Sequence, residues 1–187
     1  MFVIGELING MYKDVRKAIG DKNKSVIQSL AKNQIASGAD ALDINVGPSS
    51  TNPLETMKWL ITTVQEATDT PLCIDSTRFE VIEAGLNLCK KKAIINSTNA
   101  DDEKLEKYLE LAKKFDAKLI ALTMDKDGIP RDRAKRTELA LKIVSAAMEK
   151  GFQIENLFID PVVLPCNVAQ AQGLELLESI REFKLLC

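Results

Sequence analysis

The chain has 187 residues, with 25 basic and 27 acidic side chains, a net charge of -2 and no histidine. This length is typical of one domain of about 100–200 residues. The composition, 45% hydrophobic and 28% charged, is that of a globular protein rather than a disordered or fibrous one. Without histidine, the chain has no Ser-His-Asp or Cys-His triad, no histidine-ligated zinc and no histidine general base.

The near-neutral charge gives no electrostatic reason to expect nucleic acid or an acidic membrane as a partner. No run of about 18 apolar residues indicates a membrane span, and no charged segment of a secretion signal precedes the first apolar run. Cys73, Cys89, Cys166 and Cys187 are widely spaced and include no Cys-x-x-Cys pair. They predict buried free thiols rather than disulfides or a structural metal site. We therefore expect a cytoplasmic protein.

Six short apolar runs alternate with longer amphipathic stretches. Runs rich in Ile, Leu and Val are typical of buried parallel strands, and they cover residues 2–5, 41–46, 72–75, 93–96, 118–124 and 157–163. Apolar side chains spaced by three and four predict helices over residues 24–37, 54–67, 78–90, 101–115, 131–150 and 167–183. Asn52 followed by Pro53 is a helix-start signal, and Gly38 and Gly151 lie where helices are expected to end.

This alternation predicts an α/β fold with a parallel sheet, either an open doubly wound sheet or part of a (β/α) barrel. Polar residues gather towards the carboxyl ends of the runs, as at a barrel mouth: Glu6, Asn9, Asp43, Asn45, Asp75, Asn96 and Asp160. In a doubly wound sheet, helices cover both faces, so Asp43 and Asn45 would be difficult to satisfy. The chain also lacks both glycine-rich nucleotide-binding motifs. A barrel is the better interpretation.

The length then becomes informative. Six units in 187 residues is roughly 31 residues per unit, whereas a complete eight-unit barrel needs about 250. We therefore expect residues 1–187 to form a single (β/α)8 TIM-barrel domain of which only the first six βα units are present.

In a barrel, the carboxylates of Asp43, Asp75 and Asp160 and the amides of Asn45 and Asn96 would converge on one basin. Such a set suits a flat heterocycle, because a carboxylate accepts two parallel bonds from an amino group and a neighbouring ring N–H. Structural explanations remain open for each residue: a buried network for Asp43, a helix cap for Asp75, a turn for Asn96 and a strand end for Asp160. Met124 fits the lining of a pocket rather than chemistry, and no metal site is expected.

Six segments in order resemble the pterin-binding barrel family, which joins dihydropteroate synthases with folate-dependent corrinoid methyltransferases. These segments are residues 6–10 (ELING), 41–48 (ALDINVGP), 73–77 (CIDST), 95–99 (INSTN), 122–124 (LTM) and 159–161 (IDP). The resemblance implies a pterin ring held by Asp75, Asn96 and Asp160. Asp160 would accept from the 2-amino group and N3–H, and the other two would serve the N1/N8 side. Asp43 and Asn45 would lie beneath the ring, with Glu6 and Asn9 at the edge of the pocket.

Within that family, the sequence is similar to methyltetrahydrofolate:corrinoid/iron–sulfur protein methyltransferases of the anaerobic acetyl-CoA pathway. The similarity implies transfer of the N5 methyl group of methyltetrahydrofolate to the cobalt(I) of a corrinoid (cobalamin) carried by a partner, the corrinoid/iron–sulfur protein. It also implies a homodimer when the protein is full length. The cobalt is the nucleophile, so no catalytic residue is expected within the chain, and the lack of histidine is unsurprising.

In the family, a polar residue of the seventh strand contacts N5, and no position here corresponds to it. The chain alone is therefore expected to be an inactive methyltransferase. Two alternatives remain open. One is a dihydropteroate synthase-like enzyme, against which Asn96 is followed by Ser97 rather than by the Asp of that pattern. The other is a non-catalytic pterin-binding fragment.

Overall fold

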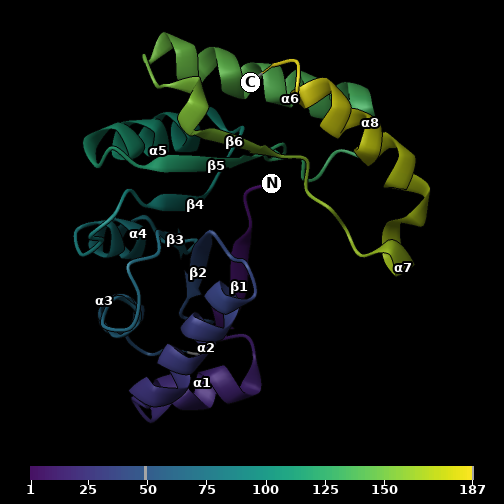
Figure 1. Cartoon of the computed structure of the whole chain (residues 1–187). Coiled ribbons are helices and arrows are strands. Elements are labelled where there is room, and N and C mark those ends of the chain that lie inside the picture. Colours follow the sequence, from purple (N-terminus) through teal and green to yellow (C-terminus); the bar gives the residue numbers. More distant parts are fainter. Residues whose placement is uncertain (49, 187) are drawn as a thin grey trace. The chain divides into compact units, whose positions relative to one another are not determined.

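The computed structural model describes residues 1–48 and 50–186. The chain divides into two compact units, Met1–Asn96 and Ser97–Cys187, which we describe separately. Figure 1 follows the alternation of strands and helices along the chain, from purple at the amino end to yellow at the carboxyl end.

The first unit is a parallel sheet covered by helices. Its strands pair in the order in which they occur along the chain: β1 (Ile4–Asn9), β2 (Ala41–Asn45), β3 (Leu72–Asp75) and the first half of β4 (Ile94–Asn99). Its helices are α1 (Lys13–Gly20), α2 (Lys24–Ala36), α3 (Pro53–Gln65) and α4 (Phe79–Leu86).

The core of this unit lies between the sheet and its helices. Strands β2 and β3 are buried almost throughout, as expected of parallel strands. Helix α3 contributes a buried face of Met57, Leu60, Ile61 and Val64. Each such side chain stabilises the fold by about 1.5–3 kcal/mol when it leaves water. The sheet is thereby fixed firmly enough to hold side chains at its carboxyl edge.

The second unit repeats the same plan of alternating strands and helices, and its strands β5 and β6 pair in parallel. Its elements are the end of β4, α5 (Asp102–Lys114), β5 (Lys118–Leu122), α6 (Arg133–Glu149), a 3₁₀ turn (Ile154–Asn156), β6 (Leu157–Asp160), α7 (Cys166–Ala169), a second 3₁₀ turn (Gln170–Gln172) and α8 (Gly173–Phe183).

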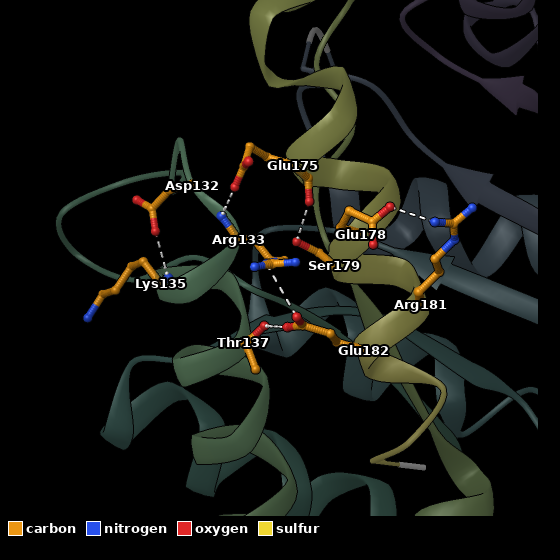
Figure 2. Close-up of polar contacts among 9 residues, drawn as sticks. All are labelled: Asp132, Arg133, Lys135, Thr137, Glu175, Glu178, Ser179, Arg181 and Glu182. Carbon is orange, nitrogen blue, oxygen red and sulfur yellow. Dashed lines mark hydrogen bonds and ion pairs between the residues drawn. The ribbon is translucent and has the colours of Figure 1, made fainter.

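Polar contacts join α6 and α8 in this unit (Figure 2). The backbone N–H of Arg133 donates to the carboxylate of Glu175 at 2.8 Å, and Nε of Arg133 lies 3.3 Å from Oε1 of Glu182. Thr137 donates to the other carboxylate oxygen of Glu182. Exposed ion pairs contribute little stability individually, so these contacts mainly set the register of the two helices.

The α/β alternation and all six strands are confirmed, although the boundaries of every strand except Leu72–Asp75 differ from those predicted, most of all for β1. Strand β1 begins at Ile4 rather than at Phe2, and both Phe2 and Val3 are exposed. It continues to Asn9 through an irregularity between Gly5 and Ile8. At this irregularity, the side chain of Gln34 accepts the N–H of Leu7 at 2.8 Å. A side chain of α2 therefore takes the place of a strand partner for Leu7, so β1 can extend beyond the predicted apolar run.

Two helix predictions were wrong. Helix α1 was not predicted, because its amino end at Tyr12 has no capping side chain and the segment is short. The single helix expected over residues 167–183 is instead two helices, separated by the 3₁₀ turn Gln170–Gln172. Gly173, a weak helix former, lies at this break.

The predicted helix signals at Asn52, Gly38 and Gly151 are confirmed. Oδ1 of Asn52 accepts the N–H of Glu55 at 3.3 Å, and Pro53 is the first residue of α3. Gly38 and Gly151 follow α2 and α6 with φ angles of +99° and +63°, which glycine adopts at little cost.

The predicted burial of the cysteines holds only in part. Cys73 is buried, Cys89 is half-buried and Cys166 is exposed, and all three are free thiols. Cys166 is exposed because it opens the short helix α7, which has no buried residue. Cys187 lies outside the described residues. In the part of the chain that the structure describes, no helix is both long and apolar enough to cross a membrane.

Candidate functional site

Four polar side chains lie at one level across the sheet of the first unit. The parallel register places Asn9 opposite Asn45, Asn45 opposite Asp75, and Asp75 opposite Asn96. Each is the last residue of its strand except Asn96, after which β4 continues to Asn99. Because partners in register point to the same face of a sheet, these groups form a row along the carboxyl edge of β1 to β4.

Two of these groups are held by residues of β2. Nδ2 of Asn45 donates to Oδ2 of Asp75 at 2.5 Å, and Nδ2 of Asn96 donates to Oδ1 of Asp43 at 3.1 Å. Asp43 precedes Asn45 by two residues, so both side chains project to the same face, as the sequence predicted. The carboxylate of Asp43 on β2 therefore holds the amide of Asn96 on β4. The amide of Asn45, also on β2, holds the carboxylate of Asp75 on β3.

Glycine contacts after β1 and β2 fix this arrangement locally. A Cβ at Gly10 would lie 2.3 Å from the carbonyl oxygen of Val46, and Gly47 has a φ of +76°. The N–H of Gly47 donates to Oδ1 of Asn45 at 2.7 Å, and the N–H of Gly10 donates to the backbone oxygen of Asn45 at 2.9 Å. Only glycine permits so close an approach of the two chain segments. As a result, both the side-chain oxygen and the backbone oxygen of Asn45 accept a backbone N–H.

Burial changes the acidity of the two carboxyl groups. Asp43 is only 2% exposed, and desolvation raises its pKa to about 7, with a further rise from the nearby charge of Asp75 and an opposing effect of the hydrogen bonds from Asn96 and Cys73. Desolvation also raises the pKa of Asp75, while the bond from Asn45 lowers it. The thiol of Cys73, buried beside these acids, has a pKa raised well above its ordinary value, chiefly by desolvation. Two neighbouring carboxyls of unequal burial are typical of functional sites.

A cavity of about 380 Å³ opens over the ends of β2 and β3. Its wall includes Asn45 and Asp75, which end β2 and β3, together with the residues that directly follow them. The apolar side chains of Met11 and Pro53 complete it. A volume of this order is that of small-molecule sites, in which a few placed polar groups lie among apolar walls. Asp75 and Asn96 are partly exposed, so their remaining atoms are accessible to a ligand.

The remaining predicted residues of the first unit have other roles in the fold. Asn9 is a turn former, since its Oδ1 accepts the N–H of Met11 at 2.9 Å. The side chain of Glu6 is exposed and acts on Asp43 only through its charge, which raises the pKa of that carboxyl.

Asp160 and Met124 belong to the second unit. Oδ1 of Asp160 accepts the N–H of Val162 at 2.7 Å, and its backbone oxygen accepts the N–H of Thr123 at 2.8 Å. Val162 has a φ of +60°, an unfavourable conformation for a β-branched residue, and strain of this kind gathers at functional sites. Met124 is half-buried, and its backbone oxygen accepts the N–H of Ala100.

Sequence reasoning did not identify Arg136 of α6. This arginine is 1% exposed, and it donates through Nε to the backbone oxygen of Pro161 and through Nη2 to Gln172, both at 3.1 Å. Its Nη1 is buried without a hydrogen-bond partner among the described residues. Arg136 lines a cavity of about 490 Å³ together with the segment that follows β6. A charged residue within an otherwise amphipathic helix gave no signal that it would be buried.

No group of three or more Cys, Asp or Glu side chains within residues 1–48 and 50–186 is arranged to hold a metal ion. The chemistry of the first-unit row is that of hydrogen bonding. The carboxylate of Asp75 and the amide of Asn96 are neighbours, and each is held by a hydrogen bond to a residue of β2. Such a pair suits a ligand with donors and acceptors along one edge.

Comparison with known proteins shows that the chain has the fold and family of pterin-binding enzymes. A family model described as "Pterin binding enzyme" matches residues 13–187, and the chain belongs to that family. It is 35% identical to a methylcorrinoid:tetrahydrofolate methyltransferase of Eubacterium limosum, over 97% of this chain and 69% of that protein. It is also 28% identical to a methionine synthase of Mycobacterium tuberculosis, over 98% of this chain and 16% of that protein.

Solved structures show the same fold. A dihydropteroate synthase from Xanthomonas albilineans, in complex with 7,8-dihydropteroate, matches 99% of this chain and 69% of its own length, with a TM-score of 0.68 and 19% identity. The enzyme from Vibrio fischeri matches 98% of this chain and 70% of its own, with a TM-score of 0.72. The predicted fold class is thus confirmed, and a chain that spans about two thirds of these enzymes agrees with six of the eight units of a barrel.

Proposed function

We propose that the chain binds a reduced folate through its pterin ring and takes part in methyl transfer between the folate and a corrinoid carried by a partner protein. The observation that carries this proposal is the pair of accessible groups, Asp75 and Asn96, held in place by Asn45 and Asp43. Membership of the pterin-binding family supports the choice of ring.

The resemblance to the family suggests the contacts, and hydrogen-bond chemistry is compatible with them. A pterin ring presents an amino group and an N–H on one edge, and a ring acceptor beside further N–H donors on another. Asp160 accepts from the 2-amino group and N3–H, because its carboxylate keeps free lone pairs after accepting the N–H of Val162. Asn96 and Asp75 serve the N1/N8 edge, with Asn96 both donating and accepting.

The methyl-transfer reaction is supported by the methyltransferase relative from Eubacterium limosum. Its name gives the direction from methylcorrinoid to tetrahydrofolate, whereas the sequence analysis expected the reverse. An enzyme lowers one barrier for both directions, so concentrations decide which occurs. The chemical difficulty lies at N5, a poor leaving group unless proton transfer or a strengthening hydrogen bond accompanies the transfer.

The corrinoid supplies the cobalt that gives or takes the methyl group. The chain has no histidine and therefore offers no imidazole ligand to that cobalt, which agrees with a corrinoid carried by another protein. We place this enzyme in the cytoplasm, consistent with the free thiols of Cys73, Cys89 and Cys166. We further propose a corrinoid/iron–sulfur protein as partner, the acetyl-CoA pathway as setting and a homodimer as assembly, all from the sequence resemblance alone.

Titration calorimetry with tetrahydrofolate tests the binding part of the proposal. We expect saturable binding to the wild-type chain and a loss of at least about tenfold in Asp75→Ala, which removes a charge-assisted acceptor. Asp40→Ala is the matched control, because Asp40 is an exposed carboxylate whose one hydrogen bond among the described residues is from the N–H of Val3. Absence of binding to the wild type would contradict the proposal.

A second assay separates the reactions. Reduced corrinoid protein and methyltetrahydrofolate are mixed with the chain, and the change in corrinoid absorbance is followed. Turnover supports the methyltransferase. Folate binding without turnover supports the pterin-binding fragment, in which residues 1–187 bind the ring but do not complete the transfer. Condensation of a pterin pyrophosphate with para-aminobenzoate would instead support a dihydropteroate synthase.

A further inference from the structure

Asp43 is a buried acid that the proposed ligand contacts do not use. It is 2% exposed, whereas Asp75 and Asn96 are partly exposed, so a ligand that reaches those two groups does not reach Asp43. Its contacts are nevertheless specific. Oδ1 of Asp43 accepts from Nδ2 of Asn96 at 3.1 Å, and the thiol of Cys73 donates to the same carboxylate.

The bond from Asn96 to Asp43 decides which way the amide of Asn96 points. An amide has one oxygen and one nitrogen on the two arms of a plane, and a turn of 180° exchanges donor and acceptor. In the reversed orientation, the amide oxygen of Asn96 would face the carboxylate of Asp43, two acceptors without a proton between them. The observed orientation leaves Oδ1 and the second N–H of Asn96 without a partner in the described part of the chain.

Asn45 acts in the same way on the next group. It is held at its oxygen by the N–H of Gly47 at 2.7 Å and at its nitrogen by Oδ2 of Asp75 at 2.5 Å. The oxygen end is occupied by a backbone donor, so only the N–H end of Asn45 is available to Asp75. Oδ1 of Asp75 then remains without a hydrogen-bond partner among the described residues, and Asp75 is partly exposed.

We propose that Asp43 and Asn45 of β2 are positioning residues that set the order of donors and acceptors which Asn96 and Asp75 present to the heterocycle. Asp43 fixes Asn96 as an acceptor beside a donor, the pattern that complements a ring N–H next to a ring nitrogen. Specificity for that edge thus originates in a residue beneath the site. This inference rests on the proposed folate binding for its ligand, but the orienting bond itself is independent of it.

The orientation depends on the ionisation of Asp43. The groups that face it are Asp75 and Cys73 on β3, Glu6 on β1 and the neutral Asn96 on β4, and desolvation together with the acids raises its pKa to about 7. An ionised Asp43 accepts from Asn96. A protonated Asp43 can donate its proton to the oxygen of Asn96, which favours the reversed amide. Affinity for the pterin edge should therefore fall as the pH falls below 7.

Calorimetry with tetrahydrofolate compares three substitutions. Asp43→Leu, similar in size but without acceptors, should weaken binding by about 10- to 100-fold. Asp43→Asn has a donor as well as an acceptor, as the protonated acid does, so its affinity at pH 8 should be close to that of the wild type at pH 6, about tenfold weaker. Asn96→Ala should weaken binding in the wild type but have little further effect in Asp43→Leu, because the two residues act as one unit.

The pH profile supplies a readout that a purely structural role would not change. The wild-type affinity should fall by about tenfold from pH 8 to pH 6, as expected for one group with a pKa near 7, and Asp43→Asn should lose this component. Equal profiles for the two proteins, or full affinity in a folded Asp43→Leu, would overturn the proposal. Thermal unfolding of each variant confirms that it is folded.

A measurement without ligand separates this proposal from the proposed function. In ¹⁵N-labelled protein, the side-chain N–H₂ signals of Asn96, identified by their loss in Asn96→Ala, should titrate near pH 7. In Asp43→Asn they should not. Titration in the apoprotein with no tetrahydrofolate binding would leave the orienting bond intact and refute only the folate. Signals of Asn96 that are insensitive to pH and to the substitution would refute the positioning role itself.

Discussion

In the first unit, the polar side chains of β2 bond to side chains of β3 and β4, whereas in the second unit the strand-ending carboxylate bonds to its own loop. Asp43 and Asn45 of β2 hold groups on β3 and β4. Asp160 of β6 accepts the N–H of Val162, two residues further along the chain. The same strand–helix plan therefore prepares polar groups in two ways, across strands or within one loop.

The difference determines what a substitution affects. A change in the first unit should spread from strand to strand, because each group is fixed by a neighbour that is itself fixed. A change at Asp160 should remain local, since its side chain accepts only the backbone N–H of Val162 among the described residues, and Thr123 bonds to its backbone oxygen. The following predictions test this contrast.

The largest effect is expected from Gly10→Ala in the first unit. The new Cβ would lie 2.3 Å from the carbonyl oxygen of Val46, so the chain after β1 or β2 must move, and the free energy of unfolding should fall by about 4 kcal/mol. Denaturant unfolding measures this. Gly20→Ala is the control, because nothing lies within 4 Å of its Cβ, and it should stabilise the protein by about 0.5–1 kcal/mol. Equal stability of the two variants would show that the glycine contact does not hold the site.

The next effect is a pH dependence that belongs to Asp43. Its pKa rises from 3.8 to about 7 on folding, so the folded state binds the proton more tightly and ionisation opposes folding. The contribution of the Asp43 carboxyl to the free energy of unfolding is fully present below pH 4. It decreases as the pH rises towards 7 and no longer changes above pH 8. Between pH 5 and pH 8, the free energy of unfolding should fall by about 3 kcal/mol more in the wild type than in Asp43→Asn. Parallel curves for the two proteins would contradict the burial of a charged Asp43.

Asp160→Asn should affect binding rather than folding. The amide keeps an oxygen to accept the N–H of Val162 but loses the charge-assisted pair proposed for the pterin, so affinity for tetrahydrofolate should fall by about 1–3 kcal/mol. Calorimetry gives the affinity, and the midpoint of thermal unfolding should remain close to that of the wild type. An unchanged affinity would remove Asp160 from the site.

The smallest effect is expected at the contact between α6 and α8. Glu182→Gln removes the ion pair with Arg133 but keeps an acceptor for Thr137 (Figure 2), and should cost about 0.5–1 kcal/mol of stability. Urea unfolding at low and high salt measures it, and the difference should shrink at high salt. A loss as large as that of Gly10→Ala would mean that the second unit, too, depends on specific polar contacts.

The strands and most helices could be predicted because their signals are local. Apolar runs of four to seven residues identified β2 to β6, and Asn52 with Pro53 identified the start of α3. The site residues could be named because Asp43, Asn45, Asp75 and Asn96 all follow the same rule, a polar group at the carboxyl end of an apolar run. Their alignment in register was implied by the parallel sheet.

The pairing within the site could not be predicted, since it depends on distances between strands. The sequence does not tell that Asn96 bonds to Asp43, two strands away, rather than to Asp75 beside it. The buried thiol of Cys73 and the bond from Gln34 to β1 are equally non-local. The short helix α1 and the break before α8 escaped prediction for a different reason, because neither has a capping side chain.

The row of Asn9, Asn45, Asp75 and Asn96 also bears on how the sheet assembles. If β2 paired one residue out of place, Asp43 and Asn45 would turn to the helix-covered face, where a carboxylate and an amide would find apolar neighbours instead of partners. Apolar strands rich in Ile and Leu tolerate such a slip, because both of their faces are alike. The polar row therefore favours a single alignment of four strands, so residues proposed to serve a ligand would also disfavour misfolded pairings.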